Sequence, residues 1–397
     1  MKKVMLFTAL AAAGLFVSCS SEDNLGPEIS KNDLQQIKIG FGATATVGTR
    51  GTGTVGGIED AENPNANVWN GQSINIFMFN KGTLDLAEFE QEGAIYDNTK
   101  FFAPTEVSQG IATASDNIVK YYPTTGAFDF WGYHLDGCET DVYNLSDDGT
   151  AIEIPFTLTG SEDIMAGKAV PTEEEINATV NEEGTPQPER IYSAFAARRN
   201  IQPNITFKHL LTRLAFQVKG GTSAICDEEN GVRVTGIEVE SKTTGKLIAA
   251  YTGDEVEQLV FNDDMANLVL MQRAGENTNE ELVALDPVTP EWDVETDLAK
   301  NTPVGEALLV APSDSYKIII RLSQTVKDNE IEGTTKEQTF GYETTISTES
   351  GFVAGNSYNV VITVFGLSEI QITTTLTPWV DGGTIDVFPE DDGNRIE

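Results

Sequence analysis

The two histidines, His134 and His209, are the residues of this 397-residue chain around which acid–base or zinc chemistry could be built. A serine triad needs a histidine beside its nucleophile, but the sequence contains no Gly-x-Ser-x-Gly elbow. A zinc site needs histidines and cysteines at short, defined spacings, and the sequence has no such cluster. His209 falls between two expected strands, where a hydrogen-bonded structural role is the more common one. We therefore expect no enzyme activity, no metal site and no cofactor.

Carboxylates are abundant, with 62 Asp and Glu residues, and could support calcium binding or glycoside hydrolysis. Calcium takes about six to eight oxygen ligands, but no acidic run follows the D-x-D-x-D-G loop pattern. Among so many acids, some pair will always match the separation of about 5–10 Å that glycosidases need. A solvated surface is therefore the expected role of the acidic runs, which are Asp147-Asp148, Glu173–Glu175, Asp227–Glu229, Asp263-Asp264 and Glu390–Asp392.

The charge balance excludes several classes of partner. Against the 62 acids stand 25 Lys and Arg residues, which gives a net charge of −37. Nucleic-acid binding needs a basic footprint, and docking on anionic lipid needs a polybasic patch, so neither is expected. Hydrophobic residues make up 40% of the chain, enough for sizeable cores, and the length suggests two domains.

The first residues have the pattern of an export signal. Lys2 and Lys3 precede an apolar run over residues 4–17 that is too short to span a bilayer. The run ends at Ser18-Cys19, which resembles the lipobox of bacterial lipoproteins; this implies cleavage before Cys19 and attachment of palmitate-type acyl chains that would anchor the protein in a membrane. An ordinary signal peptide is the alternative. We assign residues 1–18 to the signal and 19–36 to a tether, and expect the other two cysteines, Cys138 and Cys226, to be free thiols.

The most informative segment follows the tether. From Ile37 to Val47 every odd position is apolar and every even one is Lys, Gly or Thr, which predicts a half-buried strand. Residues 48–57 are a glycine-rich stretch that contains Arg50, and such exposed loops are accessible to proteases. The same glycines match G-x-G-x-x-G, but a dinucleotide site needs a helix next, and an acidic stretch stopped by Pro64 follows here instead.

The rest of the chain consists mainly of short alternating runs separated by turn residues, which predicts an all-β protein of antiparallel β-sandwiches. We expect two domains, residues 37–208 and 209–397. An acidic, proline-bearing surface loop is expected over 171–189, and helical turns near 193–199 and 254–260. The expected strands are 73–79, 117–123, 128–133, 151–158, 205–210, 213–218, 232–239, 247–251, 308–311, 316–322, 339–346, 358–365, 370–376 and 384–388.

Several segments, taken in their order along the chain, resemble the fimbrillin-like family, the subunits of type V pili. They are the lipobox at Cys19, the strand 37–47 with Thr49-Arg50, the runs 73–79, 121–123, 128–133 and 161–167, the Phe-x-His-x-Leu stretch 207–214, and the segments 352–358 and 378–379. The resemblance covers nearly the whole chain.

The resemblance implies a fold and a mechanism. It implies two transthyretin-like β-sandwich domains, export to the outer membrane as a lipoprotein, and an arginine-specific protease that removes the lipid together with the first strand. Arg50 matches the cleavage position and would leave Gly51 as the new amino terminus. The vacated edge would accept a strand from another fimbrial subunit. The candidate donor strand is the C-terminal region, with alternating residues Ile370, Ile372, Leu376, Ile385 and Val387.

The sequence therefore supports a structural subunit of a surface fimbria that polymerises by donor-strand exchange. A surface lipoprotein that binds glycan or a host protein and never polymerises is the alternative. Its support would come from aromatic side chains on exposed loops, and Trp69, Trp131, Trp292 and Trp379 could stack on sugar rings, although packing is the more common role of scattered tryptophans.

Overall fold

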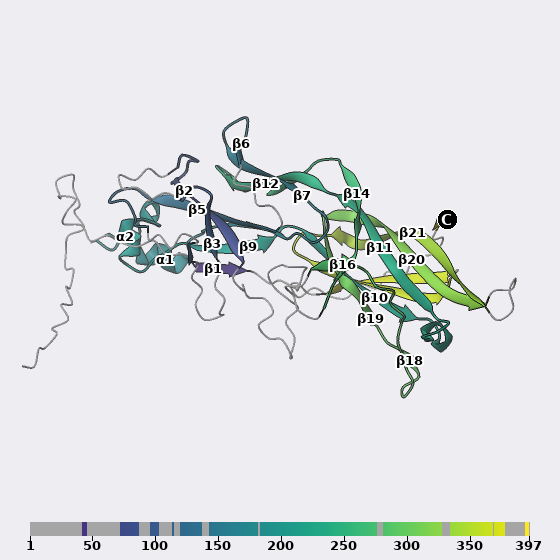
Figure 1. Ribbon diagram of the computed structural model, residues 1–397. Coiled ribbons are helices and arrows are strands. Elements are labelled where there is room, and N and C mark those ends of the chain that lie inside the picture. The colour runs from purple at the N-terminus through teal and green to yellow at the C-terminus, as the bar shows by residue number, and fades with distance from the viewer. Residues whose placement is uncertain are drawn as a thin grey trace, which may run out of the picture.

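The computed structural model describes residues 42–45, 72–86, 96–102, 113–114, 120–136, 143–181, 183–275, 281–327, 334–367, 369–377 and 394–396. These residues form an elongated molecule of two β-sandwiches placed end to end (Figure 1). None of the helices in this part of the chain is long and apolar enough to cross a membrane.

The first sandwich contains a seven-stranded and a four-stranded sheet. The seven-stranded sheet has the order β1-β9-β8-β5-β2-β3-β4, and the smaller one the order β13-β12-β7-β6. The bounds are β1 Gly42–Ala45, β2 Ser73–Asn80, β3 Thr99–Phe102, β4 Thr113–Ala114, β5 Phe128–Leu135, β6 Asn144–Leu145, β7 Ala151–Thr157, β8 Ile164–Lys168, β9 Asn204–His209, β12 Thr244–Tyr251 and β13 Leu259–Phe261.

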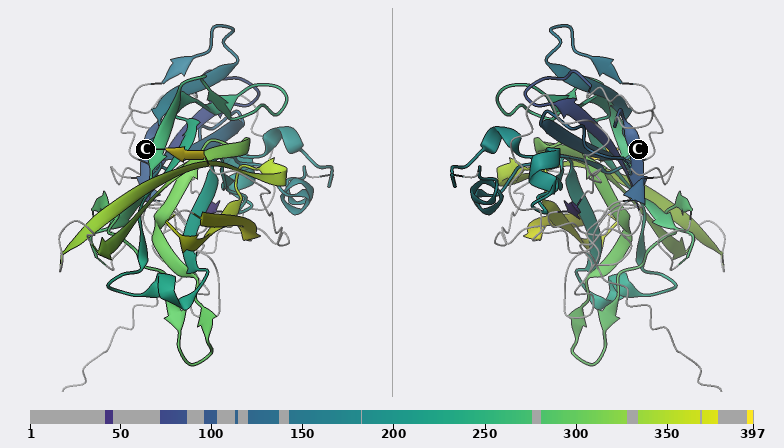
Figure 2. Two further views of the ribbon diagram at one scale, coloured as in Figure 1. Left: turned by 90° about the vertical axis from the view of Figure 1, so that its right-hand side faces the viewer. Right: turned by 90° about the vertical axis from the view of Figure 1, so that its left-hand side faces the viewer.

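Helices cover the other face of the seven-stranded sheet. They are α1 (Glu173–Ala178), the 3-10 turn η2 (Pro188–Arg190) and α2 (Ala194–Ala197), and the end-on views show them to one side of the sandwich (Figure 2). The sheet is therefore buried on both faces. Along β2, Ile76 and Met78 pack in the core that includes α2, while Phe77 and Phe79 pack in the core shared with the smaller sheet.

The second sandwich encloses one apolar core between a sheet of order β19-β10-β22-β23 and a sheet of order β14-β11-β20-β21-β24. Its strands alternate as expected; in β20, Ile318 and Ile320 are fully buried. The bounds are β10 Thr212–Gly220, β11 Val232–Lys242, β14 Met265–Val269, β19 Thr302–Val310, β20 Ser313–Lys327, β21 Thr335–Phe352, β22 Ser357–Gly366, β23 Glu369–Thr377 and β24 Asn394–Ile396. Two small hairpins, β15 (Met271–Arg273) with β16 (Leu282–Ala284) and β17 (Trp292–Asp293) with β18 (Leu298–Ala299), and the 3-10 turn η3 (Ser223–Cys226) complete it.

The chain crosses between the sandwiches more than once. After β9 it enters the second sandwich through β10 and β11, and β12 then returns to pair antiparallel with β7, so that Leu247 lies in the core of the first sandwich. A boundary between residues 208 and 209 stays a prediction for the domains. The pairing of β12 with β7 and β13 shows that residues 244–261, which follow this boundary, contribute strands to the first sandwich.

The all-β class predicted from the sequence is confirmed, and so is the helical turn near 193–199. Two local predictions are wrong. The expected loop 171–189 contains α1, because Thr172 and Glu175 form a reciprocal capping box that starts a helix. The expected helical turn at 254–260 is absent from these described residues, which lead into β13 instead. In the expected strand 117–123, residues 120–123 hold only a single bridge at Tyr121, and 117–119 lie outside the described residues.

Candidate functional site

The outer edge of the seven-stranded sheet is formed by β1, which lies within the strand predicted over Ile37–Val47. β1 pairs in parallel with β9, with Gly42 opposite Asn204 and Ala45 opposite Phe207. The burial of β9 alternates strictly, and Ile205 and Phe207 point into the core. β1 therefore covers the backbone of a strand whose inward side chains are already part of the first sandwich.

The other side of β9 is paired less completely. β8 pairs with it at Met165↔His209 and Ala166↔Lys208, and a single bridge joins Ala169 to Ile205. If β1 were absent, the described strands would leave the outer hydrogen-bonding groups of β9 without a neighbour along residues 204–207. An unpaired edge of this kind is a template for another strand.

Buried histidine–carboxylate contacts lie where the first sandwich meets the second. His209 ends β9, and its Nδ1 is 2.7 Å from Oδ2 of Asp163, with both side chains almost completely buried. This is the structural environment predicted for His209. A histidine enclosed in this way does not reach a substrate, so the pair supports the fold rather than catalysis.

The second histidine lies two strands away. His134 on β5 is opposite Met165 of β8, its Nδ1 is 2.7 Å from the carbonyl oxygen of Ser73, and its Nε2 is 3.2 Å from Asp136. Burial acts to lower the pKa of His134, but the hydrogen bond and charge of Asp136 outweigh it, so the pKa is raised. Its proton is therefore held more firmly in the folded protein than in the unfolded chain.

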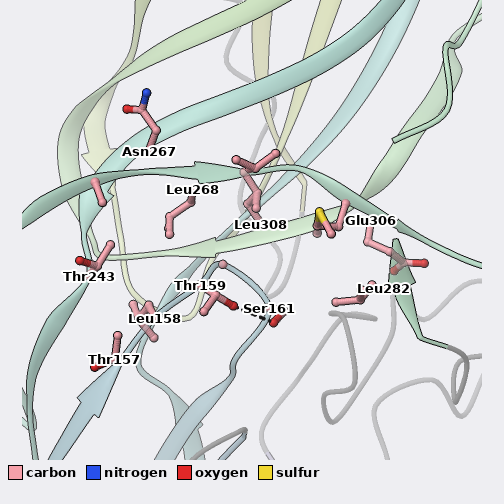
Figure 3. Close-up of a pocket in the computed structure, with 15 residues that line it drawn as sticks. Thr157, Leu158, Thr159, Ser161, Thr243, Asn267, Leu268, Leu282, Glu306 and Leu308 are labelled. Atoms are coloured by element: carbon pink, nitrogen blue, oxygen red, sulfur yellow. Dashed lines mark hydrogen bonds between the residues drawn. The ribbon is translucent and has the colours of Figure 1, made fainter. Parts of the chain in front are cut away.

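A groove of about 550 Å³ lies at the junction of the sandwiches (Figure 3). The turn after β7, strands β14 to β16 and strand β19 line it, and Leu158, Leu268 and Leu308 give it an apolar surface. Glu306 is the one ionisable residue among those that line it, and its carboxylate lies 3.6 Å from Arg273. The described residues that line the groove therefore include no pair of ionisable groups that could act as acid and base.

Metal or sugar chemistry finds little support in the described residues. No group of three or more His, Cys, Asp or Glu side chains there is arranged to hold a metal ion. Trp131 is buried against Tyr251, and the indole N–H of the half-buried Trp292 donates to Asp297. Cys226 is a free thiol whose pKa is raised by burial. Trp69, Trp379 and Cys138 lie outside the described residues.

The candidate donor residues are only partly described. β23 pairs antiparallel with β22; Ile372 is buried in the core of the second sandwich, Ile370 packs against it half-buried, and Leu376 is opposite Tyr358. β24 pairs with β21 near Tyr342. Ile385 and Val387 lie outside the described residues, as do Cys19, Arg50 and Gly51.

One polar cluster was not predicted from the sequence. Arg190 and Arg199 stack on Phe195 at the end of the first sandwich that carries the helices, and Arg198 lines the same cavity as Phe195. The signal was present, because three of the nine arginines in this acidic chain fall within ten residues. The acidic segment 171–189 that precedes these arginines predicts a solvated loop, so the sequence gives no expectation of a cation cluster beside it.

Comparison with known proteins gives one strong match. Residues 61–379, well over half of the chain, match the sequence profile of the fimbrillin-like family. No curated protein sequence matches the chain.

Solved structures with a similar arrangement share little sequence with this chain. A putative cell adhesion protein from Bacteroides uniformis is 16% identical, with 87% of this chain and 99% of that chain covered and a TM-score of 0.40. A fimbrial protein from Bacteroides vulgatus is 11% identical, with 87% and 100% covered and a TM-score of 0.44. The fimbrial anchor protein Mfa2 from Porphyromonas gingivalis is 9% identical, with 88% and 99% covered and a TM-score of 0.31.

Proposed function

Since the chain belongs to the fimbrillin-like family, we propose that it is a structural subunit of a surface fimbria that polymerises by donor-strand exchange and has no enzyme activity. Its partners are other fimbrial subunits and an arginine-specific protease. It reaches the outer membrane as a lipoprotein acylated on Cys19. Cleavage after Arg50 then leaves Gly51 as the amino terminus and separates the segment that contains β1 from the sandwich.

The observation that carries this proposal is the position of β1 at the outer edge of the seven-stranded sheet, in parallel register with β9. A strand in the middle of a sheet cannot leave without breaking two ladders, whereas an outer strand leaves by breaking one. Its loss opens the backbone of β9 next to the buried side chains of Ile205 and Phe207. The opened edge supports addition of a strand from a second subunit.

The residue types of β1 favour its replacement. Gly42, Ala43, Thr44 and Ala45 carry little apolar area. A fully buried Val, Leu or Ile contributes about 1.5–3 kcal/mol relative to an exposed one. A donor that places Ile385 and Val387 opposite β9 therefore buries more apolar area there than the four residues of β1 do, which favours exchange.

The donor is best placed after β23. Using Ile370, Ile372 and Leu376 would require β23 to leave β22, and Ile372 is 4% exposed in its own core. Withdrawing such a side chain forfeits about 1.5–3 kcal/mol. Ile385 and Val387 follow β23 in the sequence, so their use leaves β23 paired with β22, and only the three residues of β24 must leave β21. The donor proposal therefore rests on this later part of the tail.

Proteolysis of the purified precursor tests the function. Treatment with an arginine-specific protease should yield a species that begins at Gly51 and a ladder of SDS-resistant oligomers. Arg50→Ala should abolish both, whereas Arg321→Ala, which removes an exposed arginine of the second sandwich, should change neither. Ladders of normal length from the Arg50→Ala precursor would refute polymerisation through this cleavage. A permanently monomeric Gly51 species would favour the non-polymerising lipoprotein.

A further inference from the structure

A second cavity, of about 290 Å³, lies beside α2 at the end of the first sandwich that is remote from the second (Figure 1). Its walls are residues 124–127, which precede β5, and residues between 189 and 198 around α2. The volume is just below the roughly 300–1,000 Å³ of pockets that enclose a drug-sized ligand. It suits one or two side chains of a bound peptide better than a whole small molecule.

Two arginine side chains stack on the ring of Phe195, which lines the cavity. The guanidinium carbons of Arg190 and Arg199 lie 3.4 Å and 3.7 Å from the ring centroid of Phe195. Arg199 also donates a hydrogen bond from Nη1 to the carbonyl oxygen of Phe195, at 3.0 Å. Cation–π contacts of this kind hold both guanidinium groups in place. They also cover the ring, which is therefore not open to stack on a sugar.

The charge of the residues that line the cavity is opposite in sign to the net charge of the chain. Among the described residues that line the cavity are two arginines, Arg190 and Arg198, and one carboxylate, that of Glu189; Arg199 adds a further positive charge on the far side of Phe195. Arg198 is exposed at the C-terminal end of α2. In a chain with a net charge of −37, the described residues of this cavity carry a local excess of cations. Arginine forks of this kind bind carboxylates in pairs of parallel hydrogen bonds.

We propose that the cavity formed around Arg190 and Arg198 binds carboxylates of an acidic peptide, and that this peptide is the run Glu390–Asp392 of a second copy of the chain. The proposal rests on the function proposed above. The chain's own C-terminal strand β24 lies beside β21 in the second sandwich, at the opposite end of the molecule from α2 (Figure 1). The acidic run that reaches the cavity therefore belongs to another subunit, whose β24 leaves β21 to deliver it.

The residues around α2 that line the cavity precede β9 closely in the sequence. β9 begins at Asn204, five residues after Arg199. β1 runs parallel to β9; a donor that instead pairs antiparallel with β9 directs its C-terminal end toward the start of β9, and the proposal takes this direction. Glu390 follows Val387 by three residues, so the acidic run comes directly after the donor residues. The arginines would then fix the register and direction of the donor by binding its charged end.

Binding of a labelled peptide to the full-length precursor tests the proposal. In the precursor β1 still occupies the edge of β9, so binding reports on the cavity rather than on strand exchange. A fluorescent peptide of residues 383–397 should bind in an anisotropy titration, and added salt should weaken the binding. Arg198→Gln should weaken it by about tenfold or more. The peptide with Glu390→Gln, Asp391→Asn and Asp392→Asn should show a similar loss, and Arg321→Gln in the protein should show none.

Three outcomes would overturn the proposal. They are an affinity of Arg198→Gln within about twofold of the unmodified protein, equal binding of the neutralised peptide, and binding of a polyuronate in place of the peptide. The proposed function and the cavity proposal can be refuted independently of each other. If ladders form only when Arg50 is present but Arg198→Gln does not weaken peptide binding, the proposal for the cavity is refuted and strand exchange is not. If Arg198→Gln weakens peptide binding but the processed protein forms no ladders, strand exchange is refuted and the cavity proposal is not.

Discussion

Replacing Gly167 of β8 by alanine should destabilise the first sandwich, because β8 and β9 approach each other too closely there for a side chain. A Cβ atom on Gly167 would lie 2.1 Å from the carbonyl oxygen of Thr206 and 3.0 Å from Cγ2 of Ile205. An ordinary contact between such atoms is about 3.5 Å, so the Cβ and the oxygen would have to move apart by about 1.4 Å. The oxygen belongs to the backbone and cannot rotate away.

Overpacking of this kind costs about 1–3 kcal/mol. For a domain of about 150–250 residues, each 1 kcal/mol lowers Tm by about 2–4 °C. Gly167→Ala should therefore lower the Tm of the first sandwich by about 2–12 °C, as measured by differential scanning calorimetry. Because β9 also pairs with β1, the same change should increase amide hydrogen exchange along residues 204–207.

Gly236 of β11 provides the matched control. It is also a strand glycine, but the atoms nearest to a Cβ there all belong to the flexible side chain of Arg321, with Cδ at 3.6 Å, which is an ordinary contact. Alanine in a strand interior gains about 0.5–1 kcal/mol over glycine, so Gly236→Ala should be neutral or slightly stabilising. If Gly167→Ala left Tm unchanged, or if both variants lost the same stability, the close approach of β8 and β9 would not be what requires glycine.

Two further predictions concern buried groups. Burial acts to lower the pKa of His134, but Asp136 and, more weakly, Asp163 raise it above its ordinary value. The stabilisation that protonated His134 gives the fold is therefore complete below about pH 6.5 and is lost as the pH rises through the folded-state pKa. The Tm difference between the unmodified protein and His134→Gln should be larger at about pH 6 than at about pH 9, and the opposite trend would show that His134 is held neutral. Ile372→Ala should lower the free energy of unfolding of the second sandwich by about 2–5 kcal/mol in chemical denaturation. Ile370→Ala should lower it clearly less, because Ile370 is only half-buried. Equal, small losses for both variants would mean that β23 is not part of that core.

Alternation along the chain was enough to predict most strands, and the failures have physical causes. The segment 73–79 was predicted as a strand and is one, but its sequence Ile-Phe-Met-Phe does not alternate. The reason lies outside the strand, since helices cover one face of the sheet and a second sheet covers the other. A strand buried on both faces loses the polar positions from which a solvent face is recognised.

The helix α1 was missed although its local signal was complete. Thr172 and Glu175 form a capping box, and this pattern is readable in sequence. The prolines and glutamates around this segment predict a loop, and this signal outweighed the helix signal of the four-residue capping box that starts at Thr172. The pairing of β12 with β7 could not be read in this way, because it joins positions about 90 residues apart in the sequence, Thr244 with Thr157 for example, and no local pattern records such a partner.

The link between the sandwiches determines how a filament of these subunits would respond to force. Only Leu210 and Leu211 separate the end of β9 from the start of β10, and the carbonyl of the fully buried Leu211 accepts a hydrogen bond from Gly355. β10 then continues as an inner strand between β19 and β22. A donor bound to β9 would therefore pull on a strand that enters the next core without a free loop. Tension would pass along paired backbone rather than through a hinge, so a fibre assembled by exchange at β9 should be stiff along its axis.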